Sequence, residues 1–246
     1  MAHLSGLRRL ERDPRQRGLP EDRAIVRRLV ERDPWLRYRE PRYQLQMIKD
    51  LAALLPAQGC RVLDVGAGSG LIGEMITLLF PDKSVTGVDI APKALPDLRI
   101  PLLKFDGCRL PFADHSFDCA LFCNVLHHAK PEIRVGLLRE ALRVTGGGPL
   151  VIKDHLATTP LDGVRLWLLD VLGNAPRGAM IEARYLGERE WDALLRELQC
   201  TGELLPPSAY RTGVADWFFP NRLEICFRIS QASSQGRCQT WPSGPS

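Results

Sequence analysis

The stretch that decides the fold is Val62-Leu63-Asp64-Val65-Gly66-Ala67-Gly68-Ser69-Gly70, in which an apolar run ends in three closely spaced glycines. Residues 71–80 follow at once with a helical pattern of apolar positions. Glycines between a strand and a helix let the backbone turn sharply and let a ligand approach it closely. The amino-terminal end of the following helix attracts a carboxylate or a phosphate. The stretch therefore predicts a strand, a ligand-binding turn and a helix.

Apolar strands alternate with helices on both sides of this stretch. Beyond the strand at 61–65, short apolar runs at 84–89, 100–105, 117–123 and 149–153 predict four more strands, and 131–144 predicts a helix. Such alternation is typical of a mainly parallel sheet covered by helices on both faces. Leu223, Ile225, Phe227 and Ile229 alternate with polar residues and predict a last strand with one more exposed face. We therefore predict an α/β protein with a doubly wound, mainly parallel sheet.

The remaining segments fit one domain. Apolar residues at three- and four-residue steps predict helices within residues 21–56, before the sheet, and over 188–198. Thr159-Pro160 is a helix-start signal inside an insertion, residues 156–186, that we expect to act as a lid. Residues 1–20 are Arg-rich and 231–246 are rich in Ser, Gly, Pro and Gln, so we expect a flexible amino-terminal segment and a disordered tail. The single domain then spans residues 21–230.

The composition argues against several classes of protein. The chain has 246 residues, 45% of them hydrophobic and 25% charged, which is ordinary for a folded globular protein. No apolar run reaches the length of a transmembrane helix, and the Arg-rich start of the chain lacks the apolar core of a secretory signal. The seven cysteines are odd in number and scattered, which favours a reduced, cytoplasmic location. A net charge of +4 is too small to require nucleic acid as a partner.

Two features bear on which ligand the glycine turn binds. The third glycine of the dinucleotide-binding pattern would fall at Leu71, and its absence favours another adenosine ligand over NAD. Asp89 ends the next predicted strand, 23 residues after Gly66, close to the separation at which a carboxylate meets ribose hydroxyls. The alternative is that Asp89 is a surface residue that only caps a helix at Ala91.

Three further motifs complete a series: Phe105-Asp106-Gly107, then Leu110-Pro111-Phe112 with Ser116-Phe117-Asp118, then Asn124-Val125-Leu126-His127-His128. In this order and spacing, residues 61–153 resemble the class I S-adenosylmethionine-dependent methyltransferases. The likeness is closest to the small-molecule branch that includes the quinone-biosynthesis methyltransferases. The resemblance implies a Rossmann-like sheet of seven strands whose last strand is antiparallel and lies beside the fifth. The chain lacks the Asn/Asp-Pro-Pro-Tyr/Phe sequence of the enzymes that methylate amino groups of DNA bases and protein glutamine.

The same resemblance implies a cofactor, S-adenosyl-L-methionine, and a role for each matching residue. The three glycines would surround its methionine part, and Asp64 would support its amino group. Asp89 would hold the ribose. Asp106 would accept from the adenine amino group with Gly107 alongside, and Asn124 would sit beside the sulfonium. The complete set of expected cofactor-binding residues is Asp64, Gly66, Ala67, Gly68, Gly70, Asp89, Ile90, Asp106, Gly107 and Asn124.

Methyl transfer from a sulfonium is an in-line displacement that depends on holding the acceptor close and aligned. A hydroxyl or acidic carbon acceptor also benefits from a base. The catalytic candidates are His155, after the fifth strand, and His128 of the pair His127-His128, with packing or helix-capping roles as the alternative. Cys119 and Cys123 lie about 13 Å apart if both are on one strand, which is too far for one zinc ion. We therefore expect no metal.

We expect methyl transfer to a small organic acceptor, at oxygen or carbon. Trp167, Met180 and Tyr185 from the insertion, with the helix that carries Met47, would form an apolar roof over the donor, which suggests an apolar or aromatic acceptor. The first alternative is a macromolecular acceptor, RNA or protein, that docks on the Arg-rich region over residues 8–42. The second is a nucleotide-binding oxidoreductase or a scaffold without catalysis. The sequence leaves the acceptor, the methylated atom and the oligomeric state open.

Overall fold

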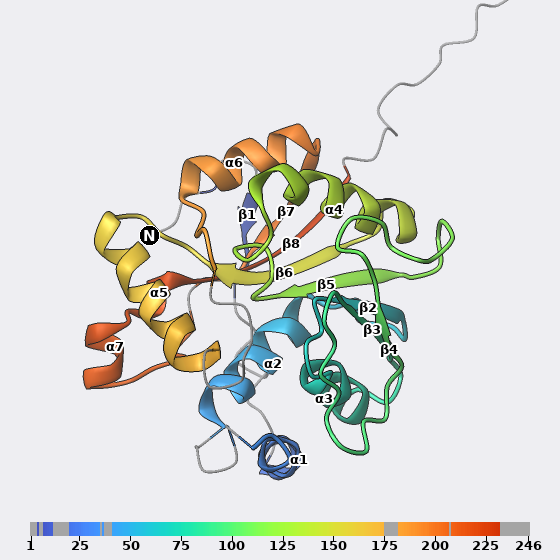
Figure 1. Ribbon diagram of the computed structural model, residues 1–246, viewed down its shortest axis with the longest axis horizontal. Coiled ribbons are helices and arrows are strands. Elements are labelled where there is room, and N and C mark those ends of the chain that lie inside the picture. Colours follow the sequence, from blue (N-terminus) through green and yellow to red (C-terminus); the bar gives the residue numbers. More distant parts are fainter. Residues whose placement is uncertain are drawn as a thin grey trace, which may run out of the picture.

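One sheet of eight strands runs through the computed structural model, with helices packed on both of its faces (Figure 1). The structure describes residues 4, 7–11, 20–34, 36, 41–174, 182–206 and 208–231. The strands are β1 (Leu7–Arg9), β2 (Arg61–Val65), β3 (Ser84–Asp89), β4 (Leu102–Lys104), β5 (Cys119–Cys123), β6 (Leu150–His155), β7 (Cys200–Leu204) and β8 (Glu224–Gln231). The helices are α1 (Pro20–Glu31), α2 (Arg42–Leu54), α3 (Leu71–Leu79), α4 (Pro131–Val144), α5 (Pro160–Asn174), α6 (Glu188–Glu197) and α7 (Val214–Phe218), with a short 3-10 helix over Asn221–Leu223.

The strand order across the sheet is β1-β7-β8-β6-β5-β2-β3-β4. Neighbouring strands are parallel except at β8, which runs antiparallel to both β6 and β7. The predicted doubly wound, mainly parallel sheet with an antiparallel last strand is therefore confirmed.

The predicted count of seven strands is wrong, because β1 adds an eighth strand at the edge of the sheet. Strand β1 pairs in parallel with residues 202–204 of β7, and Arg8 forms an ion pair of 2.6 Å with Glu203. A three-residue edge strand with two arginines has no apolar alternation, so periodicity does not reveal it. Most of the segment predicted to be flexible lies outside the described residues, and so does the predicted tail from residue 232 onward.

Alternate side chains of the central strands enter two hydrophobic cores, one on each face of the sheet. Leu63 packs with residues of α4 and α6, whereas its neighbour Val62 packs with residues of α1, α2 and α3. Strand β6 is buried along its whole length because both of its faces are covered. Within the described residues, every helix is too short or too polar to cross a bilayer.

The parallel strands end along one edge of the sheet, and this edge carries the side chains that the sequence singled out. Asp89 is the last residue of β3, Asn124 directly follows β5, and His155 is the last residue of β6. The glycine turn connects the end of β2 to α3, which begins at Leu71. In open α/β sheets, ligands bind outside the carboxyl ends of the strands. The fold thus gathers the predicted site residues on the edge where a ligand is expected.

Candidate active site

The glycine turn has the backbone conformation that its sequence predicts. Gly66, Gly68 and Gly70 all have positive φ angles, of 76°, 57° and 78°. A Cβ atom at Gly66 would lie only 2.5 Å from a methyl group of Val125, whereas a Cβ atom at Gly68 would meet no atom of the described residues within 4 Å. The first glycine is therefore needed for packing, and the second faces free space that a ligand can fill.

The side chain of Asp89 connects the end of β3 to the glycine turn by a hydrogen bond. Its Oδ2 accepts a hydrogen bond of 2.8 Å from the backbone N–H of Gly68, and its Oδ1 accepts one of 2.8 Å from Ala91. Asp89 thus accepts from the backbone N–H of Ala91, but no helix begins at Ala91, so the expected alternative of a helix cap there is wrong. Each carboxylate oxygen has a second lone pair, so these two bonds leave acceptor capacity for a ligand hydroxyl.

Asp64 is a buried acid with an unused acceptor. Asp64 is 1% exposed, and its Oδ2 has no hydrogen-bond partner among the described residues. Burial, reinforced by the nearby charge of Asp89, raises the pKa of Asp64 to about 7. A buried polar atom without a partner is costly. A cationic group bound beside the glycine turn would satisfy Asp64, so this site fits the amino group of a methionine-type ligand.

Asp106 and Gly107 follow β4 at the same edge of the sheet. The Oδ1 atom of Asp106 accepts backbone hydrogen bonds of 2.8 Å from Cys108 and 2.7 Å from Arg109, and these bonds lower the pKa of Asp106. Gly107 has a φ angle of 83°, and a Cβ atom there would lie 3.1 Å from the side chain of Ile90. The structure thus brings Ile90, which follows β3, close to the Asp106-Gly107 turn.

Asn124 belongs to a buried polar network that sequence reasoning missed. The ammonium group of Lys153 donates to Asn124 Oδ1 over 2.7 Å, to Glu224 Oε2 over 2.5 Å, and also to the Tyr43 hydroxyl. All three ammonium protons thus have acceptors. Arg211 donates to the other oxygen of Glu224 over 2.5 Å. A lysine within the apolar strand 150–153 was the one signal in the sequence that could have revealed this network.

The electrostatics of this network keep its lysine charged. Burial alone would lower the pKa of Lys153, but its attraction to Glu224 outweighs burial and raises that pKa above its usual range. Burial and the charge of Glu224 raise the pKa of Tyr43 to about 12, so its phenol stays protonated at neutral pH.

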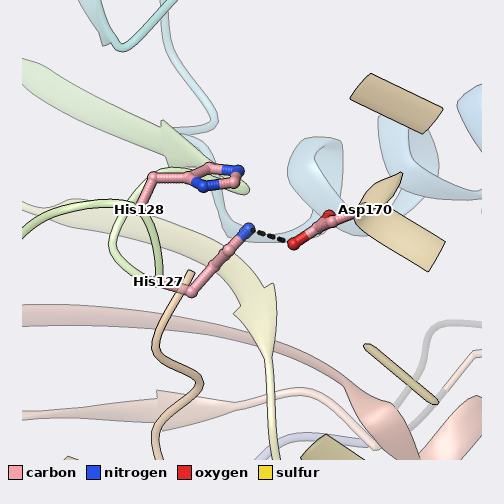
Figure 2. A group of neighbouring side chains, drawn as sticks. All are labelled: His127, His128 and Asp170. Atoms are coloured by element: carbon pink, nitrogen blue, oxygen red, sulfur yellow. Dashed lines mark ion pairs between the residues drawn. The ribbon is translucent and has the colours of Figure 1, made fainter. Parts of the chain in front are cut away.

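The two adjacent histidines lie in a second polar cluster, which Figure 2 shows. His127 donates from Nδ1 to Asp154 Oδ1 over 2.5 Å, and its Nε2 lies 3.4 Å from Asp170 Oδ2. Burial alone would lower the pKa of His127, but the carboxylates of Asp154 and Asp170 outweigh burial and raise that pKa to about 9. Tyr185 donates its hydroxyl to Asp170 over 2.5 Å. Asp170 comes from α5, which the sequence did not connect with the histidines.

The two candidate bases occupy different surroundings. His128 is half-buried, and its Nδ1 donates to the backbone carbonyl of Glu182 over 2.9 Å. Burial and the neighbouring His127 lower the pKa of His128, so its ring is neutral at pH 7. His155 is buried, and its Nδ1 lies 3.3 Å from Glu224 without making a hydrogen bond. Asp154, the residue before His155 in β6, binds the His127 ring.

The structure also places the residues that were expected to form an apolar roof. Met47 is buried in the core beneath the sheet, and Trp167 on α5 is 51% exposed to solvent. Met180 lies outside the described residues, so the expected roof stays a prediction. Cys119 is buried in β5, as expected of a small hydrophobic residue, and its neighbour Cys123 is half-buried.

Known proteins share this sequence pattern and fold. A family described as "Methyltransferase domain" matches residues 63–152. An uncharacterized methyltransferase of Mycobacterium tuberculosis (strain H37Rv) is 30% identical over 187 residues, which cover 67% of this chain and 70% of that protein. A ubiquinone biosynthesis O-methyltransferase of Cereibacter sphaeroides is 35% identical over 108 residues, which are 40% of this chain and 43% of that protein. The matched segment thus spans less than half the length of the ubiquinone enzyme.

A solved structure supports the assignment at the level of the fold. The structure of a SAM-dependent methyltransferase from Thermotoga maritima has a TM-score of 0.56 and 19% sequence identity, and the match covers 85% of this chain and 99% of that one. Together these likenesses show that the chain belongs to the class I S-adenosylmethionine-dependent methyltransferases. It is an enzyme of that class with S-adenosylmethionine as its methyl donor, and it resembles the quinone-biosynthesis members.

Proposed function

We propose that the protein transfers the methyl group of S-adenosylmethionine to a small organic acceptor, at an oxygen or a carbon atom. The observation that carries this proposal is the position of Asn124. Asn124 directly follows β5 and accepts a hydrogen bond from Lys153 of the buried network, and its neighbour Val125 lies against Gly66 of the glycine turn. Donor and acceptor would therefore meet at the carboxyl end of β5.

For the methionine end of the donor, the three glycines and Ala67 would form the cradle, and Asp64 would bind the ammonium group. The free space at Gly68 and the unpartnered oxygen of Asp64 both support this placement. Gly70, the residue before α3, directs the start of that helix toward the donor carboxylate, where the helix dipole favours negative charge.

For the nucleoside end, Asp89 would accept from the ribose hydroxyls with the lone pairs that its two backbone hydrogen bonds leave free. Ile90 and Gly107 would contact the adenine ring, and Asp106 would accept from its amino group. The close approach of Ile90 to Gly107 supports a shared surface that could contact the ring. Asn124 would then sit beside the sulfonium.

The bound donor supplies a methyl group that is already activated by its sulfonium charge. The protein therefore has to align the acceptor and take up the proton that the acceptor loses. His155 and His128 are the candidate bases. His155 supports this role by its place at the end of β6 and by a ring nitrogen that makes no hydrogen bond, and His128 supports it by being neutral at pH 7.

An apolar or aromatic acceptor fits the ring-rich surroundings of this edge. The rings of His127 and Tyr185 stack with centroids 5.4 Å apart, and the Tyr185 and His155 rings meet edge to face at 6.1 Å. The likeness to a ubiquinone biosynthesis O-methyltransferase also supports an acceptor that carries a hydroxyl group on a ring.

A macromolecular acceptor has less support. Within the described residues, several arginines of the region 8–42 already form ion pairs inside the chain, namely Arg8 with Glu203, Arg27 with Glu31, and Arg32 with Glu74. Such pairing reduces the positive surface that would attract a nucleic acid. A steep fall of binding with rising salt, measured with bulk RNA, would revive this alternative.

The first test is calorimetric titration with S-adenosylmethionine, S-adenosylhomocysteine and NADH in parallel. We expect saturable binding of the two adenosyl compounds and a loss of at least tenfold in affinity in Asp89→Ala, because a charged acceptor of backbone and ribose groups is removed. Asp97→Asn is the matched control, since it removes an exposed carboxylate nearby and should bind as the parent does. Binding of NADH alone would overturn the donor-site assignment.

The second test addresses the acceptor. Donor carrying a labelled methyl group is incubated with phenols, hydroquinones and compounds with acidic carbons, and label in the product is measured. We expect His155→Ala to lower kcat at least tenfold while donor affinity stays unchanged. Donor binding without transfer to any of these acceptors would favour the scaffold reading instead.

A further inference from the structure

His127, His128 and Asp170 bring three potential ligand atoms within 4.8 Å of one another. Figure 2 shows the two imidazole rings on the loop after β5, and the carboxylate reaching toward them from α5. His127 and Asp170 are buried and His128 is half-buried, so solvent reaches the cluster chiefly at His128. Two imidazole nitrogens and one carboxylate oxygen are a common ligand set for divalent transition metals.

We propose that His127, His128 and Asp170 bind one divalent transition-metal ion, with zinc as the reference ion. Three protein ligands leave a fourth position for water or for an oxygen of a small molecule. The site differs from the cysteine–histidine combination that the sequence excludes, because its third ligand comes from α5.

The groups behind both histidines support this assignment. A histidine that binds a metal almost always donates its other ring N–H to a carboxylate or a backbone carbonyl. His127 donates from Nδ1 to Asp154, and His128 donates from Nδ1 to the carbonyl of Glu182. Because both acceptors can only accept, each Nδ1 carries a proton, so Nε2 is the atom through which each ring would bind an ion.

An unpartnered nitrogen points into the cluster. The His127 side chain is 0% exposed, and its Nε2 makes no hydrogen bond to any described residue. It lies 3.4 Å from Asp170 Oδ2, longer than the ~2.8 Å of a charge-assisted hydrogen bond. Two ligands of one tetrahedral ion, each about 2.1 Å from it, lie about 3.4 Å apart. The separation therefore suits a shared ion better than a direct bond.

Asp170 is held in place by contacts outside the cluster. Tyr185 donates to its Oδ2 over 2.5 Å. The first turn of α5 is fixed independently, because Asp162 forms an ion pair of 2.7 Å with Arg222. A ligand set that is positioned before the ion arrives binds it with less loss of conformational freedom.

The rival reading is an ion-free triad in which a protonated His127 lies between Asp154 and Asp170. The two readings differ by one exchange, because a metal ion bound at Nε2 replaces the proton on that nitrogen. If the protein also methylates a small acceptor, as proposed above, the metal takes His128 out of the list of bases and leaves His155. Only that last assignment rests on the proposed function.

The experiment uses the full chain after treatment with a chelator. Zn²⁺ and Co²⁺ are titrated into it, with metal analysis for stoichiometry, the visible absorption of Co²⁺ for coordination, and thermal unfolding for stability. We expect one ion per chain, Co²⁺ bands typical of nitrogen and oxygen ligands, and a rise in Tm, because an ion that binds only the folded state stabilises it.

Three variants locate the ion. His128→Ala and Asp170→Asn should each lose at least a hundredfold in Zn²⁺ affinity, since each removes one of three ligands. His115→Asn removes an exposed histidine outside the cluster and should bind as the parent does. Circular dichroism confirms that each variant is folded.

No binding to the folded parent at micromolar Zn²⁺, or equal binding by the parent and both ligand variants, would overturn the metal site. Donor titration on the same samples separates this result from the proposed function. Donor binding without metal binding contradicts only the metal site, whereas metal binding without donor binding contradicts only the donor assignment.

Discussion

Gly66 and Gly68 have the same backbone conformation but different neighbours, so the same substitution should have different effects. Gly66→Ala places a methyl group 2.5 Å from Val125 in a left-handed conformation, and we expect it to cost about 3 kcal/mol of stability. Gly68→Ala meets no atom and should cost only the conformational strain, about 1 kcal/mol. Urea unfolding measures both values.

Gly68→Ala, which should cost less stability than Gly66→Ala, should lose a large part of its affinity for the donor. The methyl group of Gly68→Ala projects into the space assigned to the donor, so we expect calorimetry to show at least a tenfold loss of affinity in a nearly fully stable protein. A Gly68→Ala protein that binds S-adenosylmethionine as the parent does would show that the donor lies elsewhere.

Asp64 makes the stability of the donor-free protein depend on pH. The pKa of this carboxyl is about 7 in the folded protein and 3.8 in the reference state, so folding favours its protonated form. Its contribution to stability is fully present below pH 3.8 and is lost as the pH rises toward 7. Asp64→Asn cannot ionise, so its stability relative to the parent should rise with pH and approach a limit of about 4 kcal/mol at pH 8.

The same acid should couple donor binding to proton release. A cationic amino group favours the charged form of Asp64, so donor affinity should increase between about pH 5 and pH 7 and then level off. At pH 6 the binding enthalpy should vary with the ionisation enthalpy of the buffer, and at pH 8 this dependence should vanish. A binding enthalpy independent of the buffer at pH 6 contradicts the assignment.

At the scale of elements, the buried network at the end of β6 and β8 should hold these two strands together. Glu224→Gln leaves the charges of Lys153 and Arg211 without their shared carboxylate, and we expect a loss of about 4 kcal/mol in urea unfolding. Lys153→Met leaves Glu224 paired with Arg211 and should cost less. The double variant should lose less than the sum of the two, because it leaves fewer unpaired charges.

An exposed ion pair gives the control for this prediction. Arg139 and Glu197 connect α4 to α6 over 3.3 Å, and both side chains are more than half exposed. Arg139→Met should change stability by less than about 1 kcal/mol, because water screens such pairs. Equal losses in Glu224→Gln and Arg139→Met would show that the buried network does not stabilise the strand pair.

The elements themselves differ in how well local sequence predicts them. Helix α4 begins at Pro131 and ends at Val144, as its periodic apolar face and the following glycines predict. Strand β7 was not located, because Thr201 and Gly202 interrupt its apolar pattern and its partners come from distant parts of the chain. Periodicity shows only which face of a segment is buried, whereas the pairing of a strand such as β7 depends on the strands beside it.

The same limit applies to the site. Asp64, Asp89 and Asn124 could be placed on one edge from the sequence, because the ends of parallel strands share an edge. The contact between His127 and Asp170 could not, because it joins residues 43 positions apart through the path of α5. Side chains that meet across separate elements are set by packing, which one sequence does not display.

At the scale of the whole molecule, β1 covers an edge of the sheet that would otherwise be open. Leu4 is 2% exposed, and the N–H of Leu10 donates to the carbonyl of Leu204 over 2.9 Å. Removing residues 1–11 should lower Tm and cause concentration-dependent association through the bare edge of β7. Thermal unfolding and light scattering over a range of protein concentrations measure both effects.

Arg8→Ala is the control for this deletion. It removes an exposed side chain and its ion pair with Glu203 but keeps the backbone of β1. We expect it to stay monodisperse wherever the parent does, with a change in stability below about 1 kcal/mol. A truncated protein that keeps the Tm and size of the parent would show that β1 does not protect the edge.

The position of β8 has a consequence for the synthesis of the protein. Its residues, Glu224–Gln231, are made after those of every other strand among the described residues, yet β8 lies between β6 and β7. While the chain is still growing on the ribosome, β6 has an open side and the pair of β1 and β7 has no place to attach. Among the described strands, β1 is translated first, and it can therefore join the sheet only after β8, which is translated last. A nascent chain of this architecture exposes strand edges throughout translation, and a chaperone that covers such edges would protect it until β8 leaves the exit tunnel.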